Sequence, residues 1–354
     1  MVLSKIDVMT ATQDDIITFL NHLKKPESED PLHKWIGTYN NYLQIFKKFF
    51  KWFNNPYCMV GLRQLRRKEK SIYKPSDLWT QEDDMIFLKF CPSKRDRCYH
   101  MMARDSSCRP SELLRLKVKD IVFKLAGDNN IQYAEILVNG KTGSRTIPLI
   151  DSLPYVKDHL DDHTPDPNSY VFRSAKTLRN ISSQTVTNMY NDYKKKYFPR
   201  LLRLKDDTVG REDKEAIKSL LTKPWNPYIQ RHTSLTQKSK FLKESVLRNH
   251  AGWTNTSDMP DKYLHYFGNE SNESILEAYG LKTKAMQLDK LRPKQCPNCS
   301  ESCKVDDRFC PKCRMVLSYD SYVEAINEKE QYTDIFDELR TRMASLEEKF
   351  NKSP

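Results

Sequence analysis

The stretch Arg109-Pro-Ser-Glu-Leu-Leu-Arg-Leu-Lys-Val-Lys-Asp120 lies where one sequence pattern gives way to another. Proline is favoured in the first turn of a helix, so the stretch predicts a helix headed by its arginine. From Val118 to Val138 the alternation of apolar and polar residues predicts two short strands. Gly140-Lys-Thr-Gly143 predicts a hairpin turn, and Arg145–Leu149 a returning strand. The pattern predicts a mainly helical protein with a small β-sheet.

Helical patterning also dominates the chain before this stretch. Asp14-Asp15 opens a run with helical spacing, and a second run extends from Trp35 to Phe53. We expect the aromatic residues of the second run to form a core stripe, with interleaved lysines available to a phosphate backbone. The segment after it is basic and predicts a backbone-tracking linker, for which a solvated charge run is the alternative. The candidate DNA-binding residues in these two segments are Lys47, Lys48, Lys51, Arg63, Arg66, Arg67 and Lys68.

The charge distribution favours a polyanionic partner. The 354 residues include 59 Lys and Arg against 47 Asp and Glu, a net charge of +12. Residues 319–354 are acidic, with nine acidic and five basic residues, so the body of the chain is more basic than the total. Nucleic acid is the usual partner of such a body, and a lysine-rich solubilising surface is the alternative. No apolar run is long enough to span a membrane, and no signal peptide is evident, so we expect a cytoplasmic, nucleoid-associated protein.

Five of the nine cysteines lie between Cys296 and Cys313. Two C-x-x-C pairs, Cys296/Cys299 and Cys310/Cys313, predict a zinc ribbon in which four thiolates bind one Zn²⁺. Four cysteine ligands leave no position for water, so the expected metal is structural. Cys303 is a spare thiol that could replace Cys299, although the symmetry of the two pairs argues against it.

An apolar stripe follows the cysteines, and it predicts an amphipathic helix or a short coiled coil. Its members recur every three or four residues, at Ile335, Leu339, Met343, Leu346 and Phe350.

Several common enzyme motifs are absent. Gly140-Lys-Thr would belong to a P-loop only with glycine at position 135, where the chain has Glu135. The dinucleotide-binding, zinc-protease and serine-hydrolase motifs are missing as well.

Four separate sequence motifs remain, and their order along the chain is more informative than any single motif. They are the stretch at Arg109, the hairpin with Lys141, Tyr228-Ile-Gln-Arg231-His232, and Ala251-Gly-Trp253 followed by Tyr263-Leu-His265. In this order and spacing they resemble the tyrosine recombinases, or phage-integrase family. The likeness is closest to archaeal members that carry a C-terminal zinc ribbon.

The resemblance implies a role for each matched residue. Arg109 and Arg231 match the arginines that bind the nonbridging oxygens of the scissile phosphate, and bidentate guanidinium groups suit that task. Tyr263 matches the nucleophile that forms a 3′-phosphotyrosyl link, with Tyr266 as a rival. Lys141 matches the general acid, and Trp253 the family's His/Trp position. The chemistry needs no metal and no ATP.

Other matched positions have a supporting or an open role. Tyr228 is a further candidate catalytic residue, which stands where many relatives have histidine. A phenol can hydrogen-bond a phosphate but cannot act as an imidazole base near pH 7, which leaves the general base open. His232 or His265 could contribute, and a purely structural role is the alternative for each. Glu112 resembles the family's supporting carboxylate, with surface charge as its alternative.

The resemblance also implies an organisation and a partner. We expect a helical core-binding domain over residues 1–60, a linker over 61–75, and a mixed α/β catalytic domain over 76–285. A zinc ribbon over 286–318 and a helical tail over 319–354 follow. The two DNA-binding domains would clamp a duplex, and four protomers would assemble on two duplexes.

Three functions fit this organisation. The expected one is a site-specific recombinase, the integrase of a mobile element. A non-cutting DNA-binding regulator of the same fold and a chromosome-dimer resolvase are the alternatives.

Overall fold

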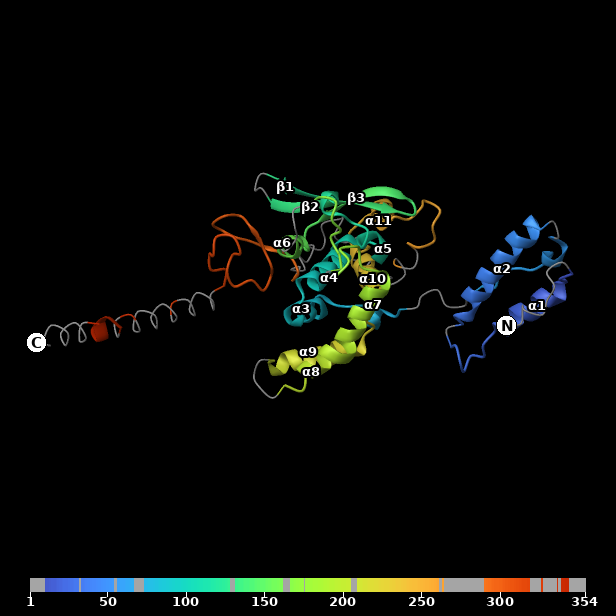
Figure 1. Cartoon of the computed structure of the whole chain (residues 1–354), viewed down its shortest axis with the longest axis horizontal. Helices are drawn as coiled ribbons and strands as arrows, with labels where there is room; N and C mark the ends of the chain where they lie inside the picture. The colour runs from blue at the N-terminus through green and yellow to red at the C-terminus, as the bar shows by residue number, and fades with distance from the viewer. Residues whose placement is uncertain are drawn as a thin grey trace, which may run out of the picture. The chain divides into compact units, whose positions relative to one another are not determined.

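A computed structural model of the chain describes residues 10–31, 33–53, 56–66, 73–127, 131–161, 166–174, 176–204, 209–260, 263, 290–318, 326, 336 and 339–343. The chain forms two compact units, residues 1–74 and 75–354 (Figure 1). None of the described helices is both long and apolar enough to cross a membrane.

The first unit is built on two helices, α1 (Gln13–His22) and α2 (Trp35–Trp52), followed by a 3-10 turn at Pro56–Met59. Thr12 caps α1 in a reciprocal capping box with Asp15, which satisfies exposed amides of the first turn. Apolar residues from both helices form the core of this unit: Ile16, Leu20, Leu43, Phe46 and Phe50.

The expectation that all the aromatic residues of α2 form a core stripe is wrong in part. Phe46 and Phe50 are buried, whereas Trp52 is 79% exposed, and Ile45, on the same helix, is 57% exposed. A helix packed on one side buries only one stripe, and α2 carries more large apolar residues than that stripe can hold.

The second unit is arranged around α4 (Lys94–Ser106), in which every residue from Cys98 to Ser106 is buried. The preceding helix, α3 (Gln81–Phe90), is capped by Thr80, whose side chain forms a capping box with Asp83. The other helices in the described part of this unit are α5 (Pro110–Leu113), α6 (Leu153–Leu160), α7 (Ser183–Asp192), α8 (Phe198–Leu201), α9 (Arg211–Thr222), α10 (Pro227–Lys238) and α11 (Glu244–Ala251). Shorter turns lie at Pro75–Asp77, Val118–Asp120 and Tyr193–Tyr197.

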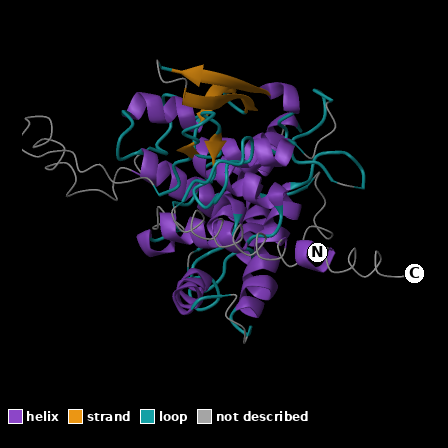
Figure 2. Cartoon of the chain, turned by 90° about the vertical axis from the view of Figure 1, so that its left-hand side faces the viewer, coloured by secondary structure: helices purple, strands orange, loops and turns teal. Residues whose placement is uncertain are grey.

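The helix predicted after Arg109 is a single turn. Pro110 is at its first position as expected, but α5 ends at Leu113 and the chain soon enters a strand. The three predicted strands are present as β1 (Ile121–Ala126), β2 (Ile131–Gly140) and β3 (Gly143–Leu149). They form one antiparallel sheet in the order β1-β2-β3, with Gly140 opposite Gly143 at the hairpin. Figure 2 shows this sheet on one face of the helices.

A cysteine-rich lobe, residues 290–318, packs against this helical body. It contains a two-stranded sheet of β4 (Lys294–Gln295) and β5 (Ser302–Cys303). Lys157 of α6 forms an ion pair with Glu301 and donates to Gln132 Oε1 at 2.6 Å. Gln132 lies at the start of β2, eight residues or about 26 Å along the strand from the hairpin. The lobe therefore lies at the end of the sheet remote from Lys141. Of the predicted C-terminal stripe, Ile335, Leu346 and Phe350 lie outside the described residues.

Candidate functional site

Two arginines from different elements meet at the end of α11. Gly252 caps this helix in the left-handed conformation, with φ of 65°, which turns consecutive carbonyls toward the arginines. Arg231, on α10, donates from Nη2 to the carbonyl of Ala251 at 2.8 Å. Arg109, at the start of α5, donates from Nη2 to the carbonyl of Gly252 at 3.2 Å. The structure thus brings Arg109 and Arg231, the two arginines matched from the sequence, to adjacent carbonyls.

A buried carboxylate holds the first arginine in place. Glu112 is 4% exposed and accepts hydrogen bonds from the backbone and the Nη1 of Arg109, both at 2.9 Å. It also pairs with Arg145 Nη2 of β3 at 2.8 Å. Burial alone would raise the pKa of Glu112, but the hydrogen bonds from Arg145 and Arg109 hold that pKa below its ordinary value. The alternative that Glu112 is only a surface charge is wrong.

The second arginine is buried. Arg231 is 6% exposed, and burial followed by the positive charge of Arg109 lowers its pKa to about 10. Tyr263 and Glu112 act in the opposite direction on the same pKa. Arg231 thus stays cationic at neutral pH and lies within electrostatic range of both Arg109 and Tyr263.

The phenol of Tyr263 packs against two other rings. Its hydroxyl is 2.9 Å from His232 Nδ1, and its ring stacks against His232 with centroids 5.6 Å apart. Trp253 stacks with the same ring at 5.4 Å, and both are buried. His232 follows Arg231 on α10, so one helix carries both the arginine and the imidazole that contacts the phenol.

Two predicted residues lie at the margin of this cluster. Lys141 is exposed in the hairpin turn, whose next residue, Thr142, donates to the carbonyl of Gly252 at 3.1 Å. Tyr228 is 55% exposed in the first turn of α10. Among the described residues, no hydrogen bond joins its hydroxyl to the cluster. The hairpin and Arg109 thus share the Gly252 carbonyl as an acceptor, whereas Tyr228 is exposed to solvent.

Some predicted residues cannot be placed. His265, Tyr266, Arg67 and Lys68 lie outside the described residues. Of the other basic residues proposed for DNA, Lys47 donates to the carbonyl of Leu62 at 2.7 Å within the first unit. The side chains that stay exposed are Lys48, Lys51, Arg63 and Arg66.

Arg145 is the main site residue that the sequence analysis did not identify. It is 8% exposed, bonds both oxygens of Glu112, and donates from Nε to the carbonyl of His250 at 3.0 Å. A signal was present in the sequence, since Arg145 shares the buried face of β3 with Ile147 and Leu149. A charged residue on the apolar face of a strand calls for a buried partner.

Gly252 is essential to this arrangement, and we expect Gly252→Ala to destabilise the second unit by about 2–4 kcal/mol. A Cβ at this position would lie 2.6 Å from Arg145 Nη1, on a residue with φ of 65°. Gly127→Ala is the matched control, because Gly127 has φ of 67° and open space around its Cα. Chemical denaturation measures both, and equal losses of unfolding free energy would show that contact with Arg145 contributes nothing.

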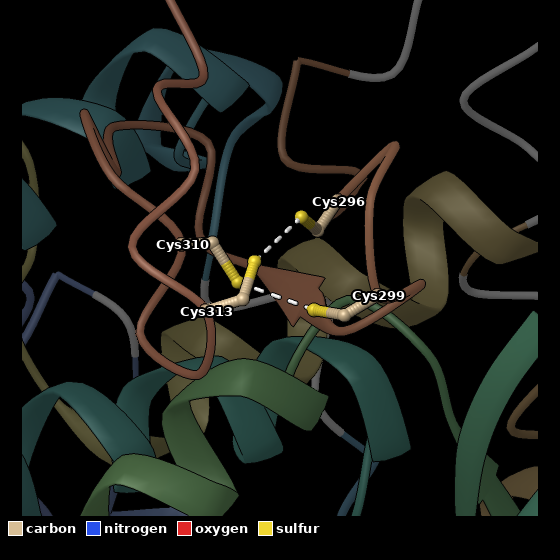
Figure 3. A group of neighbouring side chains, drawn as sticks. All are labelled: Cys296, Cys299, Cys310 and Cys313. Atoms are coloured by element: carbon tan, nitrogen blue, oxygen red, sulfur yellow. Dashed lines mark hydrogen bonds between the residues drawn. The ribbon is translucent and has the colours of Figure 1, made fainter.

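The four thiols of the cysteine-rich lobe come together as the spacing predicted. Their sulfur atoms all lie within 4.8 Å of one another (Figure 3). The thiols approach across the two pairs, with Cys296 3.5 Å from Cys313 and Cys299 3.6 Å from Cys310. Tetrahedral Zn–S bonds of about 2.3 Å place sulfurs about 3.8 Å apart, so the donor set fits such an ion. Cys303 is buried outside this group, and its thiol donates to the carbonyl of Glu301.

The two C-x-x-C turns repeat the same backbone geometry. Ser300 N donates to Cys296 O at 2.8 Å, and Arg314 N donates to Cys310 O at 2.9 Å. Ser300 and Arg314 both adopt positive φ, of 56° and 62°. Two turns of one shape therefore present two sulfurs each to a common centre.

Comparison with known proteins identifies related folds. The family model described as the phage integrase family matches residues 80–268. A search of curated proteins found no match. The structure of XerH site-specific recombinase bound to palindromic difH substrate, a post-cleavage complex, matches with a TM-score of 0.50 and 14% identity. That match covers 77% of this chain and 74% of the other.

Two further solved structures give lower scores. XerA recombinase matches with a TM-score of 0.40 and 15% identity, over 78% of this chain and 87% of the other. A lambda integrase dimer bound to a COC' core site matches with a TM-score of 0.44 and 14% identity, over 70% and 80%.

Proposed function

Because this chain belongs to the phage integrase family, the tyrosine recombinases, we propose that it cuts and rejoins duplex DNA through a 3′-phosphotyrosyl intermediate. The observation that carries the proposal is the convergence of Arg109 and Arg231 on adjacent carbonyls beside the phenol of Tyr263. XerH, which the fold resembles, is a site-specific recombinase crystallised on DNA after cleavage.

The arginines would stabilise charge on the scissile phosphate. Each uses part of its guanidinium on the protein, Arg109 on Glu112 and Gly252 and Arg231 on Ser107 and Ala251. These contacts fix the planes of both groups before DNA binds, and the N–H groups that remain can meet the nonbridging oxygens. Preorganised donors of this kind supply much of the rate in phosphoryl transfer.

Tyr263 would act as the nucleophile, with His232 as the base. A phenol has a pKa of about 10 in water, so attack at neutral pH needs a proton acceptor. His232 Nδ1 lies 2.9 Å from the phenol oxygen, within proton-transfer distance. Tyr228, at the usual histidine position, is exposed, and its phenol cannot replace an imidazole. This contact supports His232 as the base that the sequence left open.

The proposed cleavage step uses only side chains of the protein and the DNA. The oxygen of Tyr263 forms a bond to phosphorus while the bond from phosphorus to the 5′ oxygen breaks. His232 accepts the phenolic proton, and Lys141 on the hairpin gives a proton to the leaving 5′ oxygen. Religation is the reverse, and the link conserves the energy of the phosphodiester.

Covalent trapping on DNA tests the proposal. Nicked suicide duplexes from the DNA that flanks the gene are mixed with the protein without divalent metal. An SDS-resistant adduct supports the reaction class. Tight, salt-sensitive binding with no adduct favours the non-cutting regulator instead.

We propose integration or excision of a mobile element as the biological role, and a chromosome-dimer resolvase would use the same chemistry. The exposed lysines and arginines of the first unit would contact the DNA backbone. Four protomers on two duplexes, at attachment-type sites, would complete both strand exchanges.

We propose that the cysteine-rich lobe is a zinc ribbon. Cys296, Cys299, Cys310 and Cys313 would hold one Zn²⁺ in a structural role, because four thiolates fill its coordination shell. We also propose that the chain is of the type found in archaeal members of the family, which carry such a ribbon at the C-terminus.

Metal content separates the two possible ligand sets. We expect the purified wild-type protein to contain one zinc per chain and Cys310→Ser to lose it, because three thiolates bind Zn²⁺ more weakly. Cys303→Ser is the matched control and should keep its zinc, as its thiol lies outside the group. Elemental analysis measures each variant, and loss of zinc in Cys303→Ser would show that Cys303 is a ligand.

A further inference from the structure

Ser107 occupies an unusual place next to the arginine cluster. It caps the C-terminus of α4 with φ of 54° and ψ of 22°, the left-handed region that glycine prefers. Its side chain is fully buried. A non-glycine residue in this backbone conformation costs on the order of 1 kcal/mol, so other interactions of Ser107 must offset that cost.

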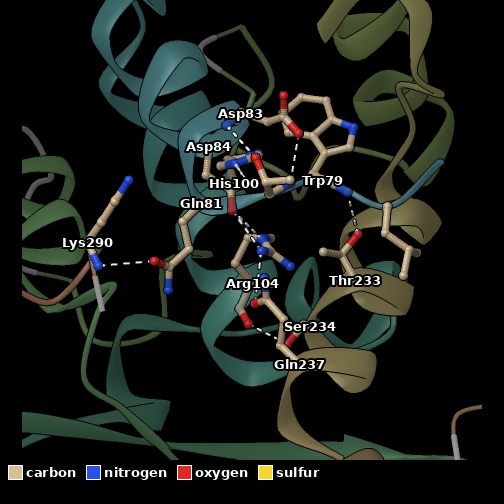
Figure 4. A network of polar contacts seen from close by, with 12 residues as sticks. Trp79, Gln81, Asp83, Asp84, His100, Arg104, Thr233, Ser234, Gln237 and Lys290 are labelled. Carbon is tan, nitrogen blue, oxygen red and sulfur yellow. Dashed lines mark hydrogen bonds and ion pairs between the residues drawn. The ribbon is translucent and has the colours of Figure 1, made fainter. Parts of the chain in front are cut away.

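Hydrogen bonds on both sides of that hydroxyl supply the compensation. Ser107 Oγ lies 2.5 Å from Ser234 Oγ of α10 and 3.1 Å from His250 Nε2 of α11. Ser234 Oγ donates in turn to the carbonyl of Arg104, as Figure 4 shows. Three elements, α4, α10 and α11, are therefore joined through one buried hydroxyl.

The direction of each hydrogen bond can be assigned. A hydroxyl has one proton, and Ser234 uses its own on the Arg104 carbonyl, so Ser107 donates to Ser234. His250 must then donate from Nε2 to Ser107. Burial, followed by the positive charges of Lys238, Arg145 and Arg231, lowers the pKa of His250 to about 3, so a neutral ring with its proton on Nε2 fits.

The same turn receives Arg231. Arg231 Nη1 donates to the carbonyl of Ser107, while its Nη2 donates to the carbonyl of Ala251. The plane of the guanidinium is therefore set by two backbone oxygens. The hydrogen bonds of the Ser107 and Ser234 hydroxyls fix the left-handed turn and so hold the Ser107 carbonyl in place.

We infer that Ser107 and Ser234 are positioning residues, which act through the Ser107 carbonyl to orient the guanidinium of Arg231 toward the scissile phosphate. The inference rests on the proposed function for its effect on DNA cleavage. Its structural part concerns the orientation of Arg231 alone.

Two substitutions test the hydrogen bond between the Ser107 and Ser234 hydroxyls, one at each residue. Ser234→Ala removes the acceptor of the Ser107 hydroxyl and leaves the residue at position 107 unchanged. Ser107→Gly removes the hydroxyl but relieves the strain of positive φ. If only the shape of the turn mattered, Ser107→Gly would cleave at least as fast as wild type. We expect both variants to lower single-turnover cleavage about tenfold with unchanged affinity for DNA, and the double variant to be no slower than the slower single variant.

Ser152→Ala is the matched control. Ser152 is also fully buried, and its hydroxyl donates to Asp105 Oδ2 at 2.9 Å, outside the hydrogen bonds that join Ser107, Ser234 and His250. We expect it to lose thermal stability without loss of cleavage rate. Equal cleavage losses in Ser152→Ala and Ser234→Ala would overturn the inference, because both would then report general destabilisation.

A measurement that needs no cleavage keeps the inference separate from the proposed function. The Nε–Hε NMR signal of Arg231 is assigned by its absence in Arg231→Lys. We expect this signal to shift or broaden in Ser234→Ala and Ser107→Gly and to stay in place in Ser152→Ala. If wild type forms no adduct, the proposed function fails while this measurement still decides the orientation of Arg231. An unmoved signal in both test variants would overturn the inference.

Discussion

Tyr263→Phe removes the covalent DNA adduct while the protein remains folded and still binds DNA. Only the phenolic oxygen can form the phosphotyrosyl bond, so we expect a loss of about 10⁴-fold or more in adduct formation. The stack on His232 and Trp253 does not depend on that oxygen, and the lost hydrogen bond to His232 costs about 1 kcal/mol. Gel analysis of SDS-resistant adducts on the nicked duplex measures the effect, and a thermal melt confirms folding.

Two other tyrosines serve as controls for the first prediction. Tyr266→Phe tests the rival nucleophile, and Tyr228→Phe removes an exposed phenol on the same helix as Arg231. Both variants should retain the adduct. An adduct that persists in Tyr263→Phe and disappears in Tyr266→Phe would move the nucleophile to Tyr266 and leave the reaction class unchanged.

Arg231→Lys should lower single-turnover cleavage by about 100- to 1,000-fold, the effect of removing one preorganised donor from a transition-state site. Lysine keeps the charge but cannot reach the carbonyls of both Ser107 and Ala251 and still present a planar pair of donors to phosphate. Because the net charge is unchanged, the affinity for DNA should change little. Rapid-quench kinetics on the suicide duplex measures the rate, and a filter-binding titration measures the affinity.

Arg200→Lys is the matched control for that substitution, since Arg200 is exposed on α8. We expect it to cleave at the wild-type rate. A rate for Arg231→Lys within a few fold of Arg200→Lys would mean that charge alone suffices at this position, which would contradict the bidentate role.

Local sequence signals predicted much of the fold. Pro110 predicted the start of α5, and the glycines of the hairpin predicted the turn between β2 and β3. These features depend on residues close together in the chain. The cysteine pairs predicted a four-sulfur cluster for the same reason, since each turn sets the geometry of its own two thiols.

Long-range packing limited the rest of the prediction. Periodicity marked Trp52 as core, but it does not say how much of α2 a small unit can cover. In the site, the matched motifs predicted Arg109, Arg231 and Tyr263. Arg145 and Ser107 act through partners that are 33 and 127 residues away in the sequence, Glu112 and Ser234. No local pattern reports such pairs.

The carbonyls of Ala251 and Gly252 have a consequence for mutagenesis. Every residue type carries a backbone oxygen, so no side-chain replacement at position 251 deletes the acceptor of Arg231. Position 251 is already alanine, and an alanine scan would pass over it without a signal. An alanine scan therefore tests this pair of carbonyls only through the substitution at Gly252. Ester replacement of the backbone amide that follows each carbonyl would weaken the acceptor and reveal what it contributes.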